Sequence, residues 1–163
     1  MKKTKWLFLI YKIPREPSSK RVYIWRKLKM LGAFALQDAV FVMPYSEKSF
    51  EQFHWLAAEI VEMDGEAEVW ESYATTKSQE KSLIDKFNES TNAQYANIIE
   101  KLNKITPITV IYERESQLRS VINEYMEIKY RDCFKADLGD KIDVILIQEQ
   151  KRLNESKFGS EEN

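Results

Sequence analysis

A short apolar run near the N-terminus, residues 6–13, most constrains what this chain can fold into. The run is nearly continuous and ends at Pro14, which is typical of a central strand that is buried on both faces. Pro14 and Pro17 keep the following loop extended, because proline fixes its own backbone and restricts the residue before it. The segments after the loop must therefore supply the elements that flank and cover this strand.

A basic helix is predicted over residues 18–31. Ser18 and Ser19 offer hydroxyl groups that can cap its first turn. Gly32 can end it, since glycine readily adopts the left-handed conformation found after a helix. One apolar stripe with helical spacing is formed by Ile24, Leu28 and Leu31.

Two short apolar runs follow, over residues 33–37 and 39–43, on either side of Asp38. They fit either one long strand with a bulge or two strands of a tight hairpin. A second helix is predicted from a cap at Ser46 to residue 63, and a half-exposed strand is predicted over residues 66–73.

The predicted order in residues 1–76 is strand, helix, two strands, helix and strand, which is the ferredoxin-like βαββαβ arrangement of the α+β class. Both helices then cover one face of an antiparallel sheet, and the other face needs a cover, often a second subunit. A helical C-terminal extension packed on this domain is predicted over residues 77–163. A polar linker over 74–79 leads into helices predicted over 81–105, 113–130 and 141–153. Residues 109–112 are either a short strand or the segment leading into the next helix. A turn is expected over 137–140 and a frayed polar tail from 154.

Positive charge is concentrated at the N-terminus, although the whole chain has a net charge of only −1. Residues 1–32 hold ten Lys and Arg against one acid, which gives +9, and residues 33–163 hold fifteen against twenty-five, which gives −10. One interpretation is a basic face for an anionic partner. The other is that the two parts neutralise each other in the fold or in a dimer.

The basic turn and helix form the candidate anion site, because a helix N-terminus carries partial positive charge and unpaired N–H groups. Other interpretations remain open: a solvated helix face, Arg21 as an internal ion-pair partner near the core edge, or a pocket for a small dianion such as chromate. If the basic face binds an anionic partner, these side chains contact DNA phosphates without reading bases. The candidate residues are Lys12, Arg15, Ser18, Ser19, Lys20, Arg21, Arg26 and Lys27.

The residue inventory gives no support for an enzyme, a metal site or a cofactor. The chain has one histidine, His54, and one cysteine, Cys133, so no Cys/His cluster can hold zinc. It has no nucleophile–base pair and no glycine-rich cofactor loop. The apolar run at the N-terminus is too short for a signal peptide and lacks a cleavage site, and no segment is long enough to span a bilayer, so we expect a cytoplasmic protein.

Several other conspicuous residues have structural interpretations. We expect Arg131 and Asp132 to fix the extension onto the core, His54 to lie partly exposed on a helix and Cys133 to be a packing residue. Five aromatic residues could stack on nucleic-acid bases, but residues at such spacing are usually core, and only Trp70 is a good candidate for an interface. These five are Tyr23, Trp25, Trp55, Trp70 and Tyr73.

Two long segments of the chain resemble a known family. They read WLFLIYKIPREPSSKRVYIWRKLKMLGAFALQDAVFVMP and QFHWLAAEIVEMDGEAEVWES, and together they span about residues 6–72. This region is similar to the N-terminal domain of the ChrB family of chromate-resistance regulators. The motif IKYRDCF at 128–134 is a looser match to the helical extension of that family.

The resemblance implies a ferredoxin-like domain related to the C-terminal part of PaaX repressors and to a small CRISPR-associated integration subunit. It also implies DNA as the partner and a role in controlling a chromate-resistance operon. We expect a homodimer, because symmetric dimers are common among small regulators of this kind. The alternative is a non-enzymatic interaction or scaffold module that acts with a separate chain.

The chain departs from the family pattern in two ways. We expect it to lack the second domain with which ChrB proteins usually continue, and if that domain is the effector sensor, this chain would not sense chromate by itself. Residues 10–13 contain no carboxylate, whereas CRISPR-associated relatives that cut nucleic acid carry an acidic metal ligand there. We therefore expect no nuclease activity.

Overall fold

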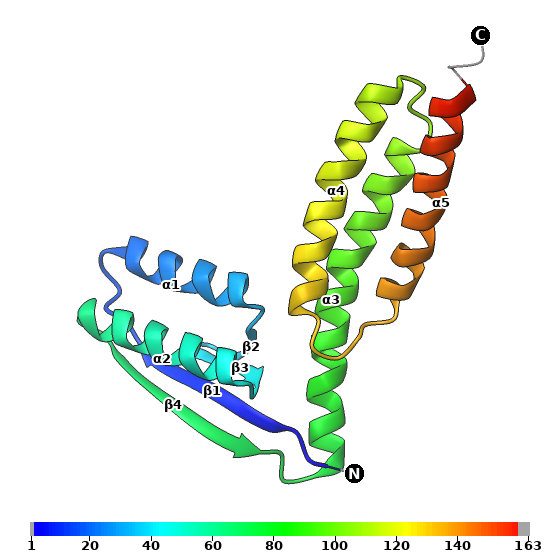
Figure 1. Cartoon of the computed structure of the whole chain (residues 1–163). Helices are drawn as coiled ribbons and strands as arrows, with labels where there is room; N and C mark the ends of the chain where they lie inside the picture. Colours follow the sequence, from blue (N-terminus) through cyan, green and yellow to red (C-terminus); the bar gives the residue numbers. More distant parts are fainter. Residues whose placement is uncertain (1, 160–163) are drawn as a thin grey trace. The chain divides into compact units, whose positions relative to one another are not determined.

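The computed structural model describes residues 2–159, and the chain divides into two compact units between residues 83 and 84 (Figure 1). The elements of the first unit are β1 (Lys5–Lys12), α1 (Ser18–Leu31), β2 (Phe34–Gln37), β3 (Val40–Pro44), α2 (Glu47–Glu62) and β4 (Glu66–Tyr73). The helices of the second are α3 (Lys77–Ile105), which begins in the first unit, α4 (Ile111–Arg131) and α5 (Leu138–Gly159).

The strands of the first unit form one antiparallel sheet in the order β2-β3-β1-β4. Strand β1 is central, as predicted, because it pairs with β3 on one side and β4 on the other. Helices α1 and α2 lie together over one face of the sheet (Figure 1). The predicted α+β class and the ferredoxin-like βαββαβ arrangement, followed by a helical segment, are confirmed.

The core of the first unit lies between the sheet and these two helices. Leu7 and Leu9 of β1 are fully buried and cluster with Ile24 of α1 and Phe53 of α2. The prediction that β1 is buried along both faces is wrong at its C-terminal half, where Ile10 is 43% exposed. Both helices pack on the face that carries Leu7 and Leu9, so they cannot cover the side chains that alternate with these residues.

Helix α1 has the predicted bounds but not the predicted cap. Its N-cap is Pro17, which makes no side-chain cap hydrogen bond, so Ser18 and Ser19 are the first helical residues rather than the cap. Gly32 ends the helix in the left-handed conformation with a φ of 79°, as predicted.

The two apolar runs around Asp38 are the separate strands β2 and β3 of a hairpin. The turn is closed by Ala39, whose φ of 58° lies in the left-handed region, and a register shift occurs between Ala35 and Gln37. The backbone N–H of Tyr11 donates to the Ala39 carbonyl at 3.1 Å. This hydrogen bond fixes the tip of the hairpin beside the end of β1.

The link from α2 to β4 also supports the end of β1. Ser46 caps α2 through a capping box with Ser49, as predicted. At the other end of α2, a Cβ added to Gly65 would lie 2.6 Å from the Lys12 carbonyl oxygen. The turn can approach the end of β1 this closely only because residue 65 has no side chain.

The second unit has its own core along the predicted apolar stripe of α3. Buried on this stripe are Tyr95, Ile98, Leu102 and Ile105. Residues 109–112 form no strand, since α4 begins at Ile111. The predicted turn over 137–140 is largely helical because α5 begins at Leu138.

Helix α5 continues to Gly159, so the tail is not frayed from residue 154 as predicted. An ion pair of 3.0 Å between Lys157 and Glu115 of α4 holds its last turn. The remainder of the predicted tail, residues 160–163, lies outside the described residues. The predicted domain boundary coincides with the start of α3, and packing of the extension on the sheet domain stays a prediction. Within residues 2–159, every helix is too short or too polar to cross a membrane.

Candidate anion-binding groove

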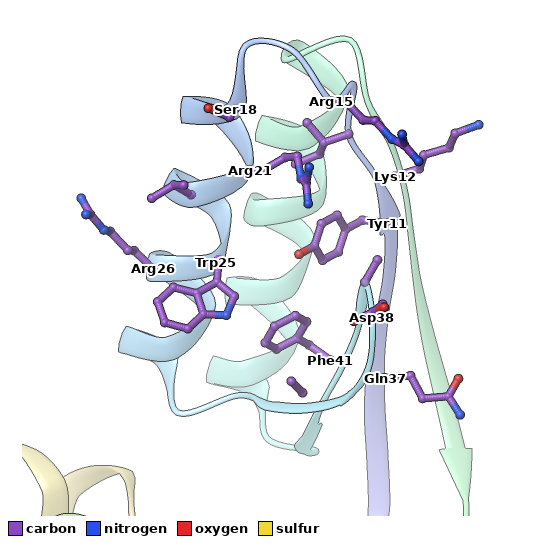
Figure 2. A pocket seen from close by; sticks show the side chains of 14 residues that line it. Tyr11, Lys12, Arg15, Ser18, Arg21, Trp25, Arg26, Gln37, Asp38 and Phe41 are labelled. Atoms are coloured by element: carbon purple, nitrogen blue, oxygen red, sulfur yellow. The ribbon is translucent and has the colours of Figure 1, made fainter.

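A groove of about 880 Å³ opens between the end of β1, the first part of α1 and the β2–β3 hairpin (Figure 2). It belongs entirely to the first unit. Its lining residues are Tyr11, Lys12, Ile13, Arg15, Ser18, Arg21, Val22, Trp25, Arg26, Ala35, Gln37, Asp38, Ala39 and Phe41. Five of the eight residues predicted as an anion site line this one groove, and Ser19, Lys20 and Lys27 do not.

The cationic residues of the groove are Lys12, Arg15, Arg21 and Arg26. Figure 2 shows the Arg21 side chain directed into the groove towards Tyr11, whereas the other three lie along its edges. All four are exposed, and none forms an ion pair with another described residue. The suggestion that Arg21 is an internal ion-pair partner is therefore wrong. The groove offers one carboxylate, Asp38, against four cations.

Two of the predicted cations are engaged elsewhere. Lys20 donates to the Met63 carbonyl at 3.1 Å and lies 3.5 Å from an Asp64 carboxylate oxygen. Lys27 makes hydrogen bonds of 2.7 and 3.0 Å to Glu59, and this interaction raises the pKa of Lys27. Both lysines thus connect α1 to α2 and the turn after it.

Helical geometry explains the separation. A rotation of about 100° per residue places Lys20 and Lys27 within about 20° of each other around α1. Ser18, Arg21 and Trp25 share a different arc of about 60°. Sequence reasoning grouped the cations by their closeness along the chain, whereas the helix divides them between two sides.

Aromatic side chains form much of the groove, a feature that sequence reasoning missed. The rings of Tyr11 and Phe41 stack with centroids 6.2 Å apart and an interplanar angle of 29°. Burial raises the pKa of the Tyr11 hydroxyl, although the nearby charge of Arg21 opposes this effect. The ring of Trp25 lies across the groove from Phe41 in Figure 2, and the residue is 51% exposed. The two-residue period of the strands and the 3.6-residue period of the helix could have shown that Tyr11, Phe41 and Trp25 lie on the same side of the sheet.

The interpretation of Tyr23, Trp25, Trp55 and Tyr73 as core residues is wrong. Trp55 is 70% exposed and Trp70 is 57% exposed, and Tyr23, Trp25 and Tyr73 are exposed as well. Trp70 lies on the outer side of β4, as predicted, but it does not line the groove. Among these residues only Trp25 combines an exposed ring with neighbouring cations in a concave site.

The remaining chemical candidates form no reactive site. His54 is exposed, and its Nδ1 lies 2.9 Å from the Phe50 carbonyl oxygen. Burial of the thiol, together with the Asp132 carboxylate, raises the pKa of Cys133, which disfavours a thiolate. Within the described part of the chain, no three His, Cys, Asp or Glu residues are grouped so that they could hold a metal ion.

Asp132 has a structural role within the second unit, whereas its expected part in fixing the extension onto the sheet domain stays a prediction. Its carboxylate accepts hydrogen bonds from the Tyr95 hydroxyl at 3.0 Å and from the Ala136 backbone N–H at 3.0 Å. The Arg131 side chain donates to the Glu127 carbonyl of its own helix at 3.2 Å. Asp132 therefore joins the end of α4 to α3 and to the loop before α5.

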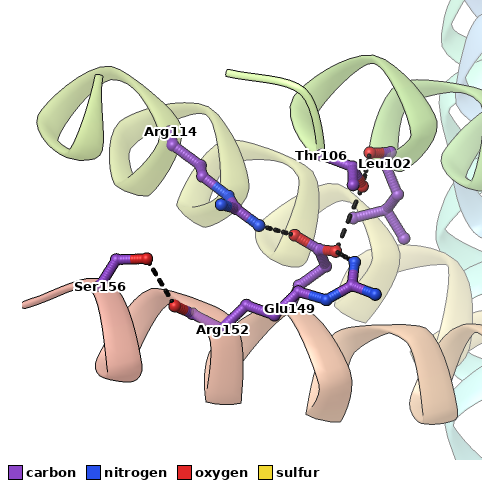
Figure 3. Close-up of polar contacts among 6 residues, drawn as sticks. All are labelled: Leu102, Thr106, Arg114, Glu149, Arg152 and Ser156. Carbon is purple, nitrogen blue, oxygen red and sulfur yellow. Dashed lines mark hydrogen bonds and ion pairs between the residues drawn. The ribbon is translucent and has the colours of Figure 1, made fainter. Parts of the chain in front are cut away.

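A buried ion cluster in the second unit was not found from the sequence (Figure 3). Glu149 of α5 is 2% exposed and contacts Arg114 of α4 at 2.6 Å, Arg152 at 2.8 Å and the Thr106 hydroxyl at 3.2 Å. Burial alone would raise the pKa of Glu149, but the hydrogen bond and charge of Arg114 outweigh it and lower the pKa. The cluster joins α4 and α5 to the end of α3.

Comparison with known proteins gives one family. The family model described as "Protein ChrB, N-terminal" matches residues 21–157. The protein named "Protein ChrB" from Cupriavidus metallidurans is 30% identical over 100 residues, which cover 61% of this chain and 30% of the relative. The chain thus matches less than a third of the length of that curated relative. No solved structure matches the chain.

Proposed function

This chain belongs to the family of ChrB N-terminal domains, and from this premise we propose that it is a DNA-binding transcriptional regulator linked to chromate resistance. The protein acts without catalysis and binds the phosphate backbone of DNA through the basic groove. The family membership and the charge of the groove support this proposal together.

The observation that carries the proposal is a set of four cations in one groove, none of which forms an ion pair with a residue between 2 and 159. Lys12, Arg15, Arg21 and Arg26 come from β1, the following loop and α1, and they line the groove together with a single carboxylate, Asp38. Keeping like charges close together is unfavourable unless an anion neutralises them. Phosphates repeat along a DNA strand, so one strand can meet several of these cations at once.

Two further features of the proposal concern assembly and control. A symmetric homodimer would present the groove twice and double the basic footprint on the DNA. Arg21 is directed into the groove, so a small oxyanion such as chromate would compete there with a phosphate. The protein would act in the cytoplasm, where the operon is transcribed.

The test is a fluorescence-anisotropy titration of a labelled duplex from upstream of the chromate-resistance genes, at several salt concentrations. The variant R21A/R26A removes two charges from the groove. The matched control K20A/K27A removes two charges from the same helix, at positions paired with Asp64 and Glu59. R21A/R26A should weaken binding at least tenfold and make the slope of log K against log salt shallower by about 2, and the control should change both far less.

Equal losses in the two variants would show that general charge, rather than the groove, attracts DNA. Binding that neither variant changes would refute the proposal. A titration with added chromate tests the effector: release of the duplex would support it, and an unchanged affinity would remove chromate from the proposal. An absence of duplex binding at low salt would favour the alternative, a module that meets an acidic protein.

A further inference from the structure

We infer that the groove holds one unpaired base of the bound DNA, stacked on the ring of Trp25. This inference rests on the proposed function and concerns the same groove. The edges of the groove contact phosphates, and its interior receives a base that has left the duplex stack.

The composition of the groove shows why phosphate binding alone does not explain it. Seven of its fourteen lining residues are apolar or aromatic, among them Ile13, Val22 and Phe41. Phosphate contacts need cations and N–H donors and gain nothing from apolar walls. The apolar surface is matched instead by the faces of a nucleobase.

The position of Trp25 indicates where such a base would lie. Its ring is 51% exposed and stands at the opening of the groove, across from Phe41 (Figure 2). Tyr11 and Phe41 form a stacked pair on the sheet side, 6.2 Å between centroids. A base inserted beside Trp25 would cover the indole ring and face this aromatic pair.

The charges of the groove are arranged for a nucleotide rather than for a phosphate alone. Arg21 lies one helical turn before Trp25 and is directed into the groove, so it can reach a phosphate beside a base stacked on Trp25. Asp38 lies in the hairpin turn, on the side opposite α1 (Figure 2). A carboxylate there repels a phosphate but can accept a hydrogen bond from the amino group of a base.

The size of the groove and the structure of DNA limit the ligand further. A volume of about 880 Å³ is within the range of pockets for small molecules and is ample for one nucleotide. In an intact duplex the faces of the bases are covered by their neighbours, and only their edges are accessible. A ring inside a groove can stack on a base only after the base is unpaired and extruded.

The test compares three labelled duplexes of otherwise identical sequence, titrated with the full chain at one salt concentration. One is fully paired, one carries a single bulged adenine and one carries a bulged abasic site at the same position. The abasic bulge reproduces the flexibility of the backbone, which can by itself favour binding, but has no base to stack. The adenine bulge should bind about tenfold more tightly than the abasic bulge.

Substitutions identify the stacking residue. W25A should abolish the preference for adenine over the abasic site, and W25F should keep most of this preference. The matched control is W55A, which removes an even more exposed tryptophan on α2, outside the groove. W55A should change none of the three affinities.

Equal binding of the adenine and abasic bulges by the unaltered chain would overturn the inference, and so would a preference that survives in W25A. Either result leaves the proposed function intact if R21A/R26A still weakens binding to the paired duplex. Failure of R21A/R26A to weaken that binding would refute the proposed function itself.

Discussion

The arginines of the groove and the arginines around Glu149 carry the same guanidinium group in opposite surroundings. Arg21 and Arg26 line an open groove and have no ion-pair partner among the described residues. Arg114 and Arg152 converge on one buried carboxylate at 2.6 and 2.8 Å (Figure 3). The comparison teaches that burial of the partner decides whether a cation stabilises the fold or is available to a ligand.

The same distinction holds within one helix. Lys20 and Lys27 of α1 contact Asp64 and Glu59, whereas Arg21 of the same helix forms no ion pair with any carboxylate in the described part of the chain. Surface pairs of this kind contribute little to stability because water screens them. The two lysines are therefore paired, as Arg114 and Arg152 are, but their ion pairs lie near the surface and add little stability.

The largest expected effect comes from removing the buried carboxylate of Glu149. Replacing Glu149 by alanine should lower the free energy of unfolding by about 3 kcal/mol, because it leaves the Arg114 charge largely buried without a partner. Urea denaturation followed by circular dichroism at 222 nm measures the change.

The control for this prediction is Glu155→Ala on the same helix. Glu155 is exposed and lies 4.0 Å from Lys151, so its loss should cost no more than about 0.5 kcal/mol. Similar losses in the two variants would mean that burial does not distinguish these carboxylates.

A second, smaller effect sharpens the comparison through pH. The pKa of Glu149 in the folded chain is lowered below its ordinary value of 4.5, so its ionised form stabilises the fold above that pH. This stability is lost as the pH falls through the lowered pKa. The difference in free energy of unfolding between the unaltered chain and E149Q should therefore be constant near pH 7 and should shrink below about pH 4.5.

Other carboxylates with lowered pKa values, such as Asp143, titrate equally in both chains and cancel in this difference. A difference that stays constant from pH 7 to pH 3 would show that the charge of Glu149 does not contribute to stability. Urea titrations at a series of pH values provide the measurement.

The smallest expected effect on stability comes from removing an exposed arginine of the groove. Arg21→Ala should change the free energy of unfolding by less than about 0.5 kcal/mol, since the side chain is exposed and unpaired. Thermal and urea denaturation of this variant check the value. A decrease in the free energy of unfolding of more than about 1 kcal/mol would show that Arg21 stabilises the fold and is not simply available to a ligand.

Much of the fold could be predicted because its signals are local. Proline, glycine and the apolar stripe determine the bounds of α1, and the capping pair Ser46 and Ser49 marks the start of α2. The hairpin could not be decided from the sequence, because its turn uses Ala39 in a conformation that usually requires glycine or asparagine.

The candidate site was predictable only in part. Arg15, Arg21 and Arg26 were found through their charge, but nothing local connects them to Phe41, whose ring the sheet brings beside that of Tyr11. Glu149 was missed because a charged residue in a polar helix is normally exposed, and its burial depends on Arg114, 35 residues away.

All the residues that line the groove fall between positions 11 and 41, while α2 and β4 support this segment from outside it. The site is therefore modular: one uninterrupted stretch encodes its walls, and the later part of the chain encodes its scaffold. Ligand preference could diverge among relatives through changes confined to that stretch. Exchanging residues 11–41 between two relatives should accordingly transfer the binding preference of one onto the framework of the other.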